Sequence, residues 1–389
     1  MNLLRKLKQF DNKNVLLLQG PVGNFFYKLS KILRKSNVYK INFNGGDFLF
    51  YPFKSINYTQ NLNNLENFYE NIFKEKNIQI LIMYNDCRKI HELAIKVAQK
   101  MNIEIWIFEE GYIRPYCITF EKGGVNANSS IPKNKEFYLK NNFKCNEKIK
   151  AIKGTFGRMA FYSFLYWLFS FLLCFYFNNK NHHRSLNPFE MFAWFLSLYR
   201  KYLYKITEKS INNKISKLNK KYFLAILQVY NDTQITHHYG KSIEEFIKET
   251  IISFSNNARA KSYLIFKHHP MDRGYKNYKN LIDELSQKYN VEGRILYVHD
   301  SYLPDILSKA LGCIVINSTV GFSALYHNCP LKVCGDAFYD IDGLTYQKDL
   351  CLFWKEAHAY KPNQKIFKNL KNYLLLTNQS NMSFYKNKF

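Results

Sequence analysis

Residues 313–325 read CIVINSTVGFSAL, and this stretch indicates how the chain folds. Its opening CIVI is apolar and largely β-branched, which predicts a buried strand, and the apolar spacing that follows predicts a helix. Asn317, Ser318 and Thr319 join the two elements. Ser and Thr are favoured helix N-caps, and the free backbone N–H groups at a helix start attract phosphate. These three residues therefore either cap the helix alone or also hold a phosphate.

The same alternation of strand and helix extends along both halves of the chain. In the second half, strands are predicted at 223–229, 263–266, 294–298 and 330–333, and helices at 242–256, 278–289, 302–309 and 322–328. In the first half, strands are predicted at 15–18, 38–43, 78–84 and 103–108, and helices at 25–35 and 91–100. Such alternation is typical of parallel sheets with crossover helices. We expect an α/β protein with two Rossmann-like lobes and a cleft between them.

The predicted domains are an N-terminal Rossmann-like domain at 1–150, a helical connector at 151–215, a C-terminal Rossmann-like domain at 216–360 and a C-terminal helix at 361–389. The connector holds AFYSFLYWLFSFLLCFYF at 160–177, which carries no charge. As a helix it would be about 27 Å long, close to the thickness of a bilayer core. Its Tyr and Trp residues are typical of a boundary between apolar and wet surroundings. We therefore favour a buried or membrane-surface helix over a spanning one.

The net charge of +26 indicates an anionic partner. Arg supplies only 10 of the 56 basic residues, whereas proteins that read base sequence rely on Arg, so nucleic acid is not the expected partner. A Lys-rich surface instead suits an anionic membrane leaflet. The eight Cys form no C-x-x-C pair, and no apolar signal segment follows the N-terminus, so a cytoplasmic protein is expected.

Polar residues follow several predicted strands, where open α/β sheets bind their ligands. Lys267, His268, His269 and Pro270 end one strand, and a cation with an imidazole suits a phosphate or a leaving group. The alternatives are one packed and one solvated His, or a metal site. The further His candidates for a metal are His237, His238 and His299. Their spacing matches no known site, so no metal is predicted.

Acidic residues end two other predicted strands. Glu109 and Glu110 follow the strand at 103–108, and either one can act as a general acid or base or pair with Arg114. Asp232, in LQVYNDTQI at 227–235, is a nucleophile, a base or an Asx-turn residue.

Glycine-containing segments follow the first two predicted strands. QGPVG at 19–23 and NGGD at 44–47 are expected to be loops where backbone approaches a ligand. Neither has the P-loop ending or the G-x-G-x-x-G spacing, so ATP and NAD are not expected and no cofactor is predicted.

Eight segments occur in a fixed order along most of the chain: LLLQGPVGNFF, INFNGGD, FEEGYIRP, HHRS, QVYNDTQI, KHHPMDRGY, VINSTVGFSALYHNCP and YDIDGLT. Together they resemble the bacterial capsular polysaccharide synthesis and export proteins of the KpsS/LipB type. The resemblance implies a GT-B-like arrangement of the lobes, with the acceptor on the N-terminal domain and the nucleotide sugar on the C-terminal one. It also implies a β-Kdo transferase that uses CMP-Kdo as donor and phosphatidylglycerol, or its lyso form, as acceptor. The product would be the start of the lipid terminus of a capsular polysaccharide.

The resemblance assigns roles to individual residues. Lys267 and His269, beside Pro270, would hold the donor phosphate and stabilise departing CMP, which leaves His268 to packing. Asp232 would form a covalent sugar adduct that gives net retention, and Glu110 would act on the acceptor hydroxyl. The remaining substrate-binding positions implied are Gln19, Gly20, Asn44, Gly45, Gly46, Gln228, Asn317, Ser318 and Thr319. Asn231 before Asp232 departs from the pattern of related chains.

The same resemblance places the protein on the cytoplasmic face of the inner membrane, beside other capsule assembly proteins. Residues 160–177 would dock there with His182, His183 and Arg184. Two other functions stay open: a non-catalytic component of capsule export, and a transferase that uses CMP-sialic acid.

Overall fold

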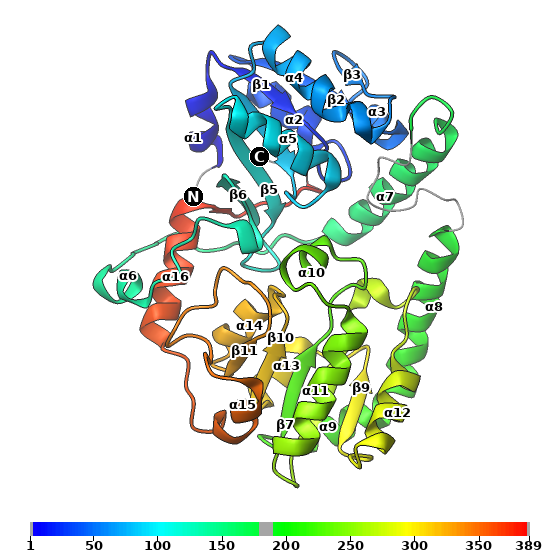
Figure 1. The fold of residues 1–389 in the computed structure, drawn as a ribbon, viewed down its shortest axis with the longest axis vertical. Coiled ribbons are helices and arrows are strands. Elements are labelled where there is room, and N and C mark those ends of the chain that lie inside the picture. Colours follow the sequence, from blue (N-terminus) through cyan, green and yellow to red (C-terminus); the bar gives the residue numbers. More distant parts are fainter. Residues whose placement is uncertain (1–2, 179–189, 387–389) are drawn as a thin grey trace. The chain divides into compact units, whose positions relative to one another are not determined.

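The computed structural model describes residues 3–178 and 190–386. The chain divides into two compact units (Figure 1). Unit 1 comprises Met1–Ser130, Cys145–Glu190 and Tyr373–Phe389, and unit 2 comprises Ile131–Lys144 and Met191–Asn372. The units are discontinuous, whereas the predicted domains were single ranges. The predicted connector at 151–215 is divided between them, because its first helix packs within unit 1.

Unit 1 contains a seven-stranded sheet with the order β12-β6-β5-β4-β1-β2-β3. The strands from β5 to β3 are parallel, and β6 pairs antiparallel with both of its neighbours, β5 and β12. The strands are β1 Asn14–Leu17, β2 Asn37–Asn42, β3 Ile56–Asn57, β4 Ile80–Tyr84, β5 Glu104–Glu110, β6 Ile118–Lys122 and β12 Gln379–Ser380. The helices are α1 Leu3–Leu7, α2 Phe25–Ile32, α3 Gly45–Phe50, α4 Leu65–Glu75, α5 Lys89–Lys100 and α7 Thr155–Leu172.

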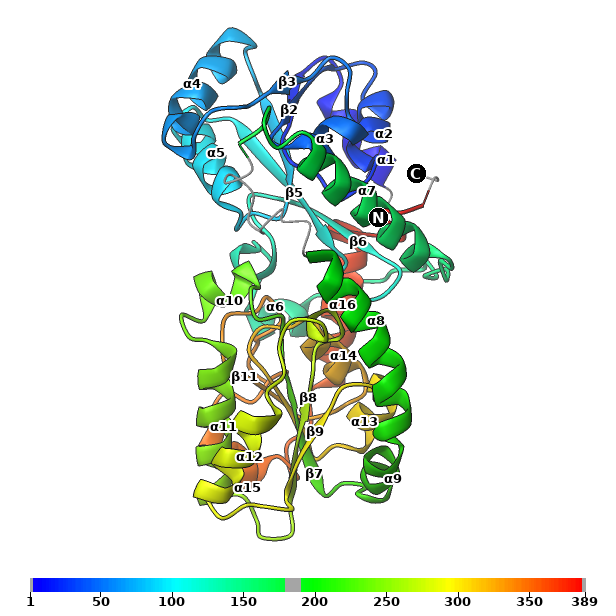
Figure 2. The same ribbon diagram turned by 90° about the vertical axis from the view of Figure 1, so that its right-hand side faces the viewer.

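The alternation of side chains along β1 explains why helices cover both faces of this sheet. Leu16 and Leu18 pack into a core that α4 and α5 share, whereas Val15 and Leu17 pack on the opposite side against α1 and α2. Figure 2 shows the two helical layers on either side of the strands. A strand buried on both faces reads as a continuous apolar run, as VLLL does in the sequence.

Unit 2 contains a five-stranded, fully parallel sheet with the order β11-β10-β7-β8-β9. Its strands are β7 Tyr222–Ile226, β8 Tyr263–Lys267, β9 Ile295–Val298, β10 Gly312–Val315 and β11 Leu331–Val333. Its helices are α6 Lys135–Lys140, α8 Glu190–Thr207, α9 Lys209–Lys217, α10 Thr233–His238, α11 Ile243–Asn257, α12 Lys279–Lys288, α13 Leu303–Lys309, α14 Val320–Tyr326 and α15 Leu350–Glu356, and α16 Gln364–Thr377 crosses the boundary to unit 1. From β7, the next strands β8 and β9 are added on one side, and β10 and β11 are then added on the other side. The neighbouring pair β7 and β10 is therefore the topological switch point of the sheet.

The predicted α/β class with two mainly parallel sheets is confirmed. Helices connect successive strands along the chain, as predicted. Two local predictions were wrong. Residues 44–47 are the start of α3 rather than a loop, because the Asn44 side chain accepts the Asp47 amide and caps a helix. The C-terminal helix predicted for 361–389 is present as α16 but ends at Thr377, and it is followed by β12, which pairs with β6 of unit 1.

The aromatic segment predicted at 160–177 forms most of α7. Tyr166 and Ser170 are buried against α3, whereas the side chains of Phe161, Phe164 and Phe171 are exposed. No helix in the described ranges is long and apolar enough to cross a bilayer. The helix is therefore a partly covered surface element of unit 1 with an apolar outer side. Residues 182–184, expected to assist it, lie outside the described residues.

Candidate functional site

Two of the predicted residues meet at the switch point of unit 2. Gln228 follows β7 and Asn317 follows β10, and these strands are neighbours. The Gln228 Nε2 donates to the Asn317 Oδ1 at 2.9 Å, and the Asn317 backbone N–H donates to the Gln228 Oε1 at 3.1 Å. This double hydrogen bond fixes both amide side chains at the carboxyl edge of the sheet, where open α/β sheets bind ligands.

Asp232 joins this pair. It is the N-cap of α10, and its Oδ1 accepts the backbone N–H of Gln234 at 3.0 Å. Its Oδ2 accepts from the Gln228 Nε2 at 3.3 Å. The Asp232 Oδ1 thus makes the Asx-turn hydrogen bond considered above, and the Oδ2 faces the amide side chain of Gln228. We call Gln228, Asp232 and Asn317 the switch-point cluster.

Lys267 ends β8, next to β7 in the sheet. Its side chain is buried, and Nζ donates to the backbone carbonyl of His299 at 2.7 Å. Burial lowers the pKa of Lys267 to about 8, so the ammonium stays mostly protonated at neutral pH. A cation held at the carboxyl end of a strand can bind a phosphate.

The two histidines after Lys267 differ in burial. His268 is buried and its Nδ1 lies 2.6 Å from the Tyr297 hydroxyl. Burial lowers the pKa of His268 to about 3, so this imidazole is neutral and packs. His269 is only partly buried, and its Nδ1 accepts the Met271 backbone N–H at 3.2 Å. Pro270 is exposed at the start of the short helix Pro270–Asp272.

Glu208 contributes to this region and was not predicted. It lies between α8 and α9, and its carboxylate accepts the His299 Nδ1 at 2.5 Å and the backbone N–H groups of His299 and Asp300 at 2.9–3.0 Å. Since His299 presents its carbonyl to Lys267, Glu208 positions the Lys267 cation through this loop. The available signal was that Glu208 is the lone acid in the Lys-rich run at 200–221.

Ser318 and Thr319 lie just before α14. The Ser318 Oγ accepts the Val320 backbone N–H at 3.2 Å, while Thr319 makes no capping hydrogen bond with its side chain. The Ser318 carbonyl also accepts the Tyr339 hydroxyl. Capping, one of the two interpretations of this segment, therefore applies to Ser318.

The predicted loop residues of unit 1 lie beneath α7. The Gln19 Nε2 donates to the Asp47 Oδ2 at 3.1 Å and to the Tyr166 hydroxyl at 3.0 Å. The Asn44 Nδ2 donates to the same hydroxyl at 2.6 Å. The helix thus shares a buried polar network with the loop after β1 and the start of α3.

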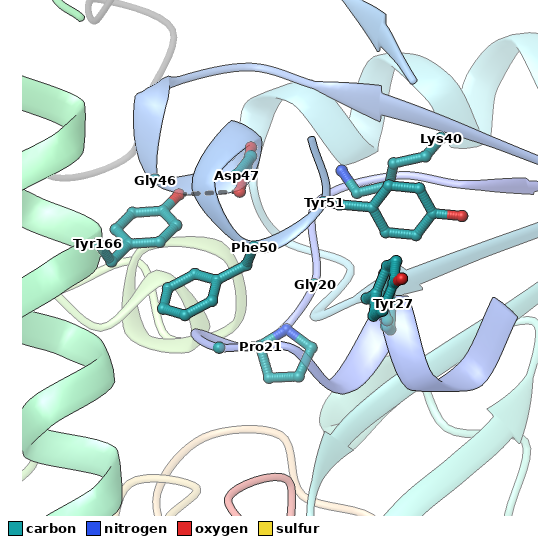
Figure 3. A pocket seen from close by; sticks show the side chains of 11 residues that line it. Gly20, Pro21, Tyr27, Lys40, Gly46, Asp47, Phe50, Tyr51 and Tyr166 are labelled. Carbon is teal, nitrogen blue, oxygen red and sulfur yellow. Dashed lines mark hydrogen bonds between the residues drawn. The ribbon is translucent and has the colours of Figure 1, made fainter. Parts of the chain in front are cut away.

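Gly45 and Gly46 let α7 approach α3 closely. A Cβ at Gly45 would lie 2.1 Å from the Phe169 carbonyl oxygen, and one at Gly46 would lie 2.5 Å from the Tyr166 ring. The backbone at these two glycines is approached by a helix of the same unit. Gly20 and Gly46 also line a small pocket together with Asp47 and Tyr166 (Figure 3).

Both candidate acids of unit 1 belong to β5 rather than to the loop after it. Glu110 forms an ion pair with Arg114 at 3.0 Å. The Glu109 Oε2 accepts the Asn85 Nδ2 at 3.0 Å, and burial raises the pKa of Glu109 to about 7. One acid of the pair is therefore held by an arginine, and the other has a pKa raised toward neutral pH.

The described part of the chain shows no group of three or more His, Cys, Asp or Glu side chains arranged to hold a metal ion. His299 is engaged by Glu208, as described above.

A parallel sheet with polar side chains at its switch point defines the chain as an open α/β protein, a class in which ligands bind at the carboxyl edge of the strands. The particular family follows from sequence comparison. The family profile described as capsule polysaccharide biosynthesis protein matches residues 79–385, and the chain belongs to this family. The predicted resemblance to the KpsS/LipB type is thereby confirmed.

Relatives of this family match nearly the whole chain. The chain is 39% identical to the capsule polysaccharide export protein KpsS of Escherichia coli, over 96% of this chain and 97% of that protein. It is 36% identical to the capsule polysaccharide modification protein LipB of Neisseria meningitidis serogroup A, over 97% and 93% of the two chains. Among solved structures, it resembles Thermosulfurimonas dismutans KpsC, a beta Kdo 2,7 transferase, at 15% identity and a TM-score of 0.41, over 92% and 89% of the chains.

Proposed function

We propose that the protein is a glycosyltransferase of capsule biosynthesis, which transfers Kdo from CMP-Kdo to phosphatidylglycerol or its lyso form. Membership of the capsule polysaccharide biosynthesis family supports the biological setting. The observation that carries the chemistry is the switch-point cluster, in which Asp232 is held beside Gln228 and Asn317. A carboxylate fixed at a ligand-binding edge is the group that a covalent sugar adduct requires.

In the first step, the Asp232 Oδ2 attacks the anomeric carbon of Kdo and forms an ester. The bond from that carbon to the phosphate oxygen breaks, and CMP leaves with the electron pair. The phosphate then carries the negative charge, which Lys267 and His269 stabilise. Asn317, Ser318, Thr319 and Pro270 complete the donor site in this proposal. CMP has a single phosphate, so these side chains suffice to neutralise it.

In the second step, the acceptor hydroxyl attacks the same carbon and releases the Asp232 carboxylate. Glu110 takes the hydroxyl proton, as a general base. Arg114, whose Nη1 lies 3.0 Å from the Glu110 Oε2, holds this carboxylate in place. Each step inverts the anomeric centre, so the two together retain its configuration.

The acceptor is a lipid, and we propose that α7 docks unit 1 on the cytoplasmic face of the inner membrane. Phe161 of α7 is 57% exposed, and Phe175, in the turn directly after α7, is 87% exposed. The net charge of +26 favours anionic lipid. Phe175→Ser should reduce flotation of the protein with phosphatidylglycerol vesicles. Phe53→Ser is the matched control, because Phe53 is 72% exposed elsewhere in unit 1. Equal flotation of both variants would contradict docking through α7.

The transferase proposal is tested by mass spectrometry of a fluorescent phosphatidylglycerol incubated with CMP-Kdo. The wild-type protein should add one Kdo, and Asp232→Asn should add none although Asn can still cap α10. With CMP-Kdo alone, the intact wild-type protein should gain the mass of one Kdo. Transfer by Asp232→Asn would remove Asp232 from the mechanism.

The same assay separates the two other candidate functions. Turnover with CMP-sialic acid but not with CMP-Kdo would favour the alternative donor. If folded protein turns over neither donor, a non-catalytic export component is the better description.

A further inference from the structure

A small pocket in unit 1 is built from five neighbouring segments. The loop after β1, α2, β2, α3 and α7 each contribute side chains or backbone to its wall (Figure 3). The transfer mechanism above gives no role to its one basic side chain, Lys40 of β2. Tyr27, Tyr51 and Phe50 supply aromatic wall around it.

Lys40 is a buried cation with few partners of its own. Its side chain is 3% exposed, and its Nζ donates to the backbone carbonyl of Ile41. Within the described ranges, no carboxylate lies within ion-pair distance of this nitrogen. Burial lowers the pKa of Lys40 to about 8, while the field of Asp47 opposes that shift, so the ammonium is mostly charged at pH 7. An ammonium has three donors, and a buried charge without a partner is costly.

Asp47, the acidic side chain of the same pocket, is engaged by other groups. Its Oδ2 accepts the Gln19 Nε2 and the Phe43 backbone N–H, each at 3.1 Å. Its Oδ1 accepts the Tyr166 hydroxyl, also at 3.1 Å. The carboxylate thus stabilises the packing of α3 and α7, and the ammonium of Lys40 lacks a direct counter-ion.

The pocket adjoins the helix that carries the exposed aromatic side chains. Tyr166 of α7 lines the pocket, and one turn earlier Tyr162 packs on Phe50 with ring centroids 5.3 Å apart. On the outer side of the same helix, Phe161 and Phe164 are 57% and 40% exposed. The pocket therefore holds the Lys40 cation of β2 on the inner side of α7, and the outer side of the same helix is apolar. A cation close to an apolar surface suits an anionic lipid.

We propose that this pocket binds the phosphate of an anionic phospholipid headgroup, with Lys40 as its counter-ion and the acyl chains along the exposed side of α7. The inference rests on the proposed function, in which such a lipid is the acceptor. It adds the residue that recognises the headgroup phosphate and places that recognition in unit 1.

The test measures binding of dihexanoyl phosphatidylglycerol, which is water-soluble, to the full chain by calorimetry without any donor. Lys40→Met should weaken binding at least tenfold, while Lys31→Met should leave it unchanged. Lys31 is a matched control because it is an exposed Lys of α2 whose Nζ lies over the Tyr27 ring, 4.9 Å from its centroid. Inorganic phosphate and neutral monohexanoylglycerol are the comparison ligands, and each should bind more weakly than the lipid.

Unchanged lipid binding by folded Lys40→Met, equal loss in Lys31→Met, or equally tight binding of inorganic phosphate would each overturn the inference. If Lys40→Met fails to fold, Lys40→Gln is measured in its place under the same criteria. Transfer of Kdo is scored separately. Lipid binding that depends on Lys40, without any turnover, would support the headgroup site and reject the transferase. Turnover by Lys40→Met with an unchanged acceptor KM would support the transferase and reject the headgroup site.

Discussion

Glu109 should make the stability of the protein depend on pH. Burial raises the pKa of this carboxyl from 4.5 to about 7, so the folded state binds its proton more tightly than the unfolded state does. The resulting stabilisation is complete below pH 4.5 and is lost as the pH rises through 7. A difference of about 2.5 pKa units corresponds to about 3 kcal/mol in total, of which about 2.5 kcal/mol is lost between pH 5 and 8.

The assay is the free energy of unfolding at pH 5 and pH 8 for the wild type and Glu109→Gln. The amide can still accept the Asn85 Nδ2 with its oxygen, so the variant keeps much of the local geometry. Wild type should lose about 2.5 kcal/mol more than the variant over this range. Glu110→Gln, which removes a partly exposed ion-paired carboxylate, should follow the wild type. An equal response of wild type and Glu109→Gln to pH would refute a raised pKa for the partly buried Glu109.

Three further outcomes follow from the same structure. Burial acts to raise the pKa of Glu208, but hydrogen bonds from His299 and Asp300 lower this pKa overall. Glu208→Gln should therefore lower the free energy of unfolding by about 2 kcal/mol at pH 7. This difference from wild type should shrink below pH 4.5. An undiminished difference at pH 3 would contradict this. Gly46→Ala should cost about 1–3 kcal/mol in thermal unfolding, because its Cβ would overlap the Tyr166 ring, and a neutral effect would show that α7 does not pack there. His268 should stay neutral from pH 5 to 8 in nitrogen-detected NMR, and titration near pH 6.5 would show that it is solvated.

Apolar periodicity was enough to predict most elements of both sheets. The strand predicted at 223–229 is too long, since β7 ends at Ile226. The prediction extended to 229 because Leu227, Gln228 and Val229 alternate between apolar and polar residues, as a strand does. The short helix after Asn44 was missed because two consecutive glycines are typical of a loop. Those glycines are tolerated because α7, more than a hundred residues away in sequence, needs their missing side chains.

The site was predictable where it depends on strand ends. Asp232 and Asn317 each follow a predicted strand and Gln228 lies near the end of one, and the order of strands in the sheet brings the three together. Glu208 was not predictable in this way, since it belongs to a helix junction and acts through the backbone of His299. Lys40 was missed for a similar reason, because a lysine in the middle of a predicted strand gives no indication that it is buried.

The pairing of β12 with β6 also affects the order in which the protein can fold during synthesis. The backbone N–H of Tyr112 donates to the Gln379 side chain, and Gln379 pairs with Thr119 across the sheet edge. The ribosome must therefore make the last described strand before the sheet begun by β1 can be finished. All of unit 2 is translated by Asn372, so it can complete its core first. Until β12 is synthesised, β6 is an unpaired edge strand of the unit 1 sheet. We expect unit 1 to be most prone to aggregation at this stage.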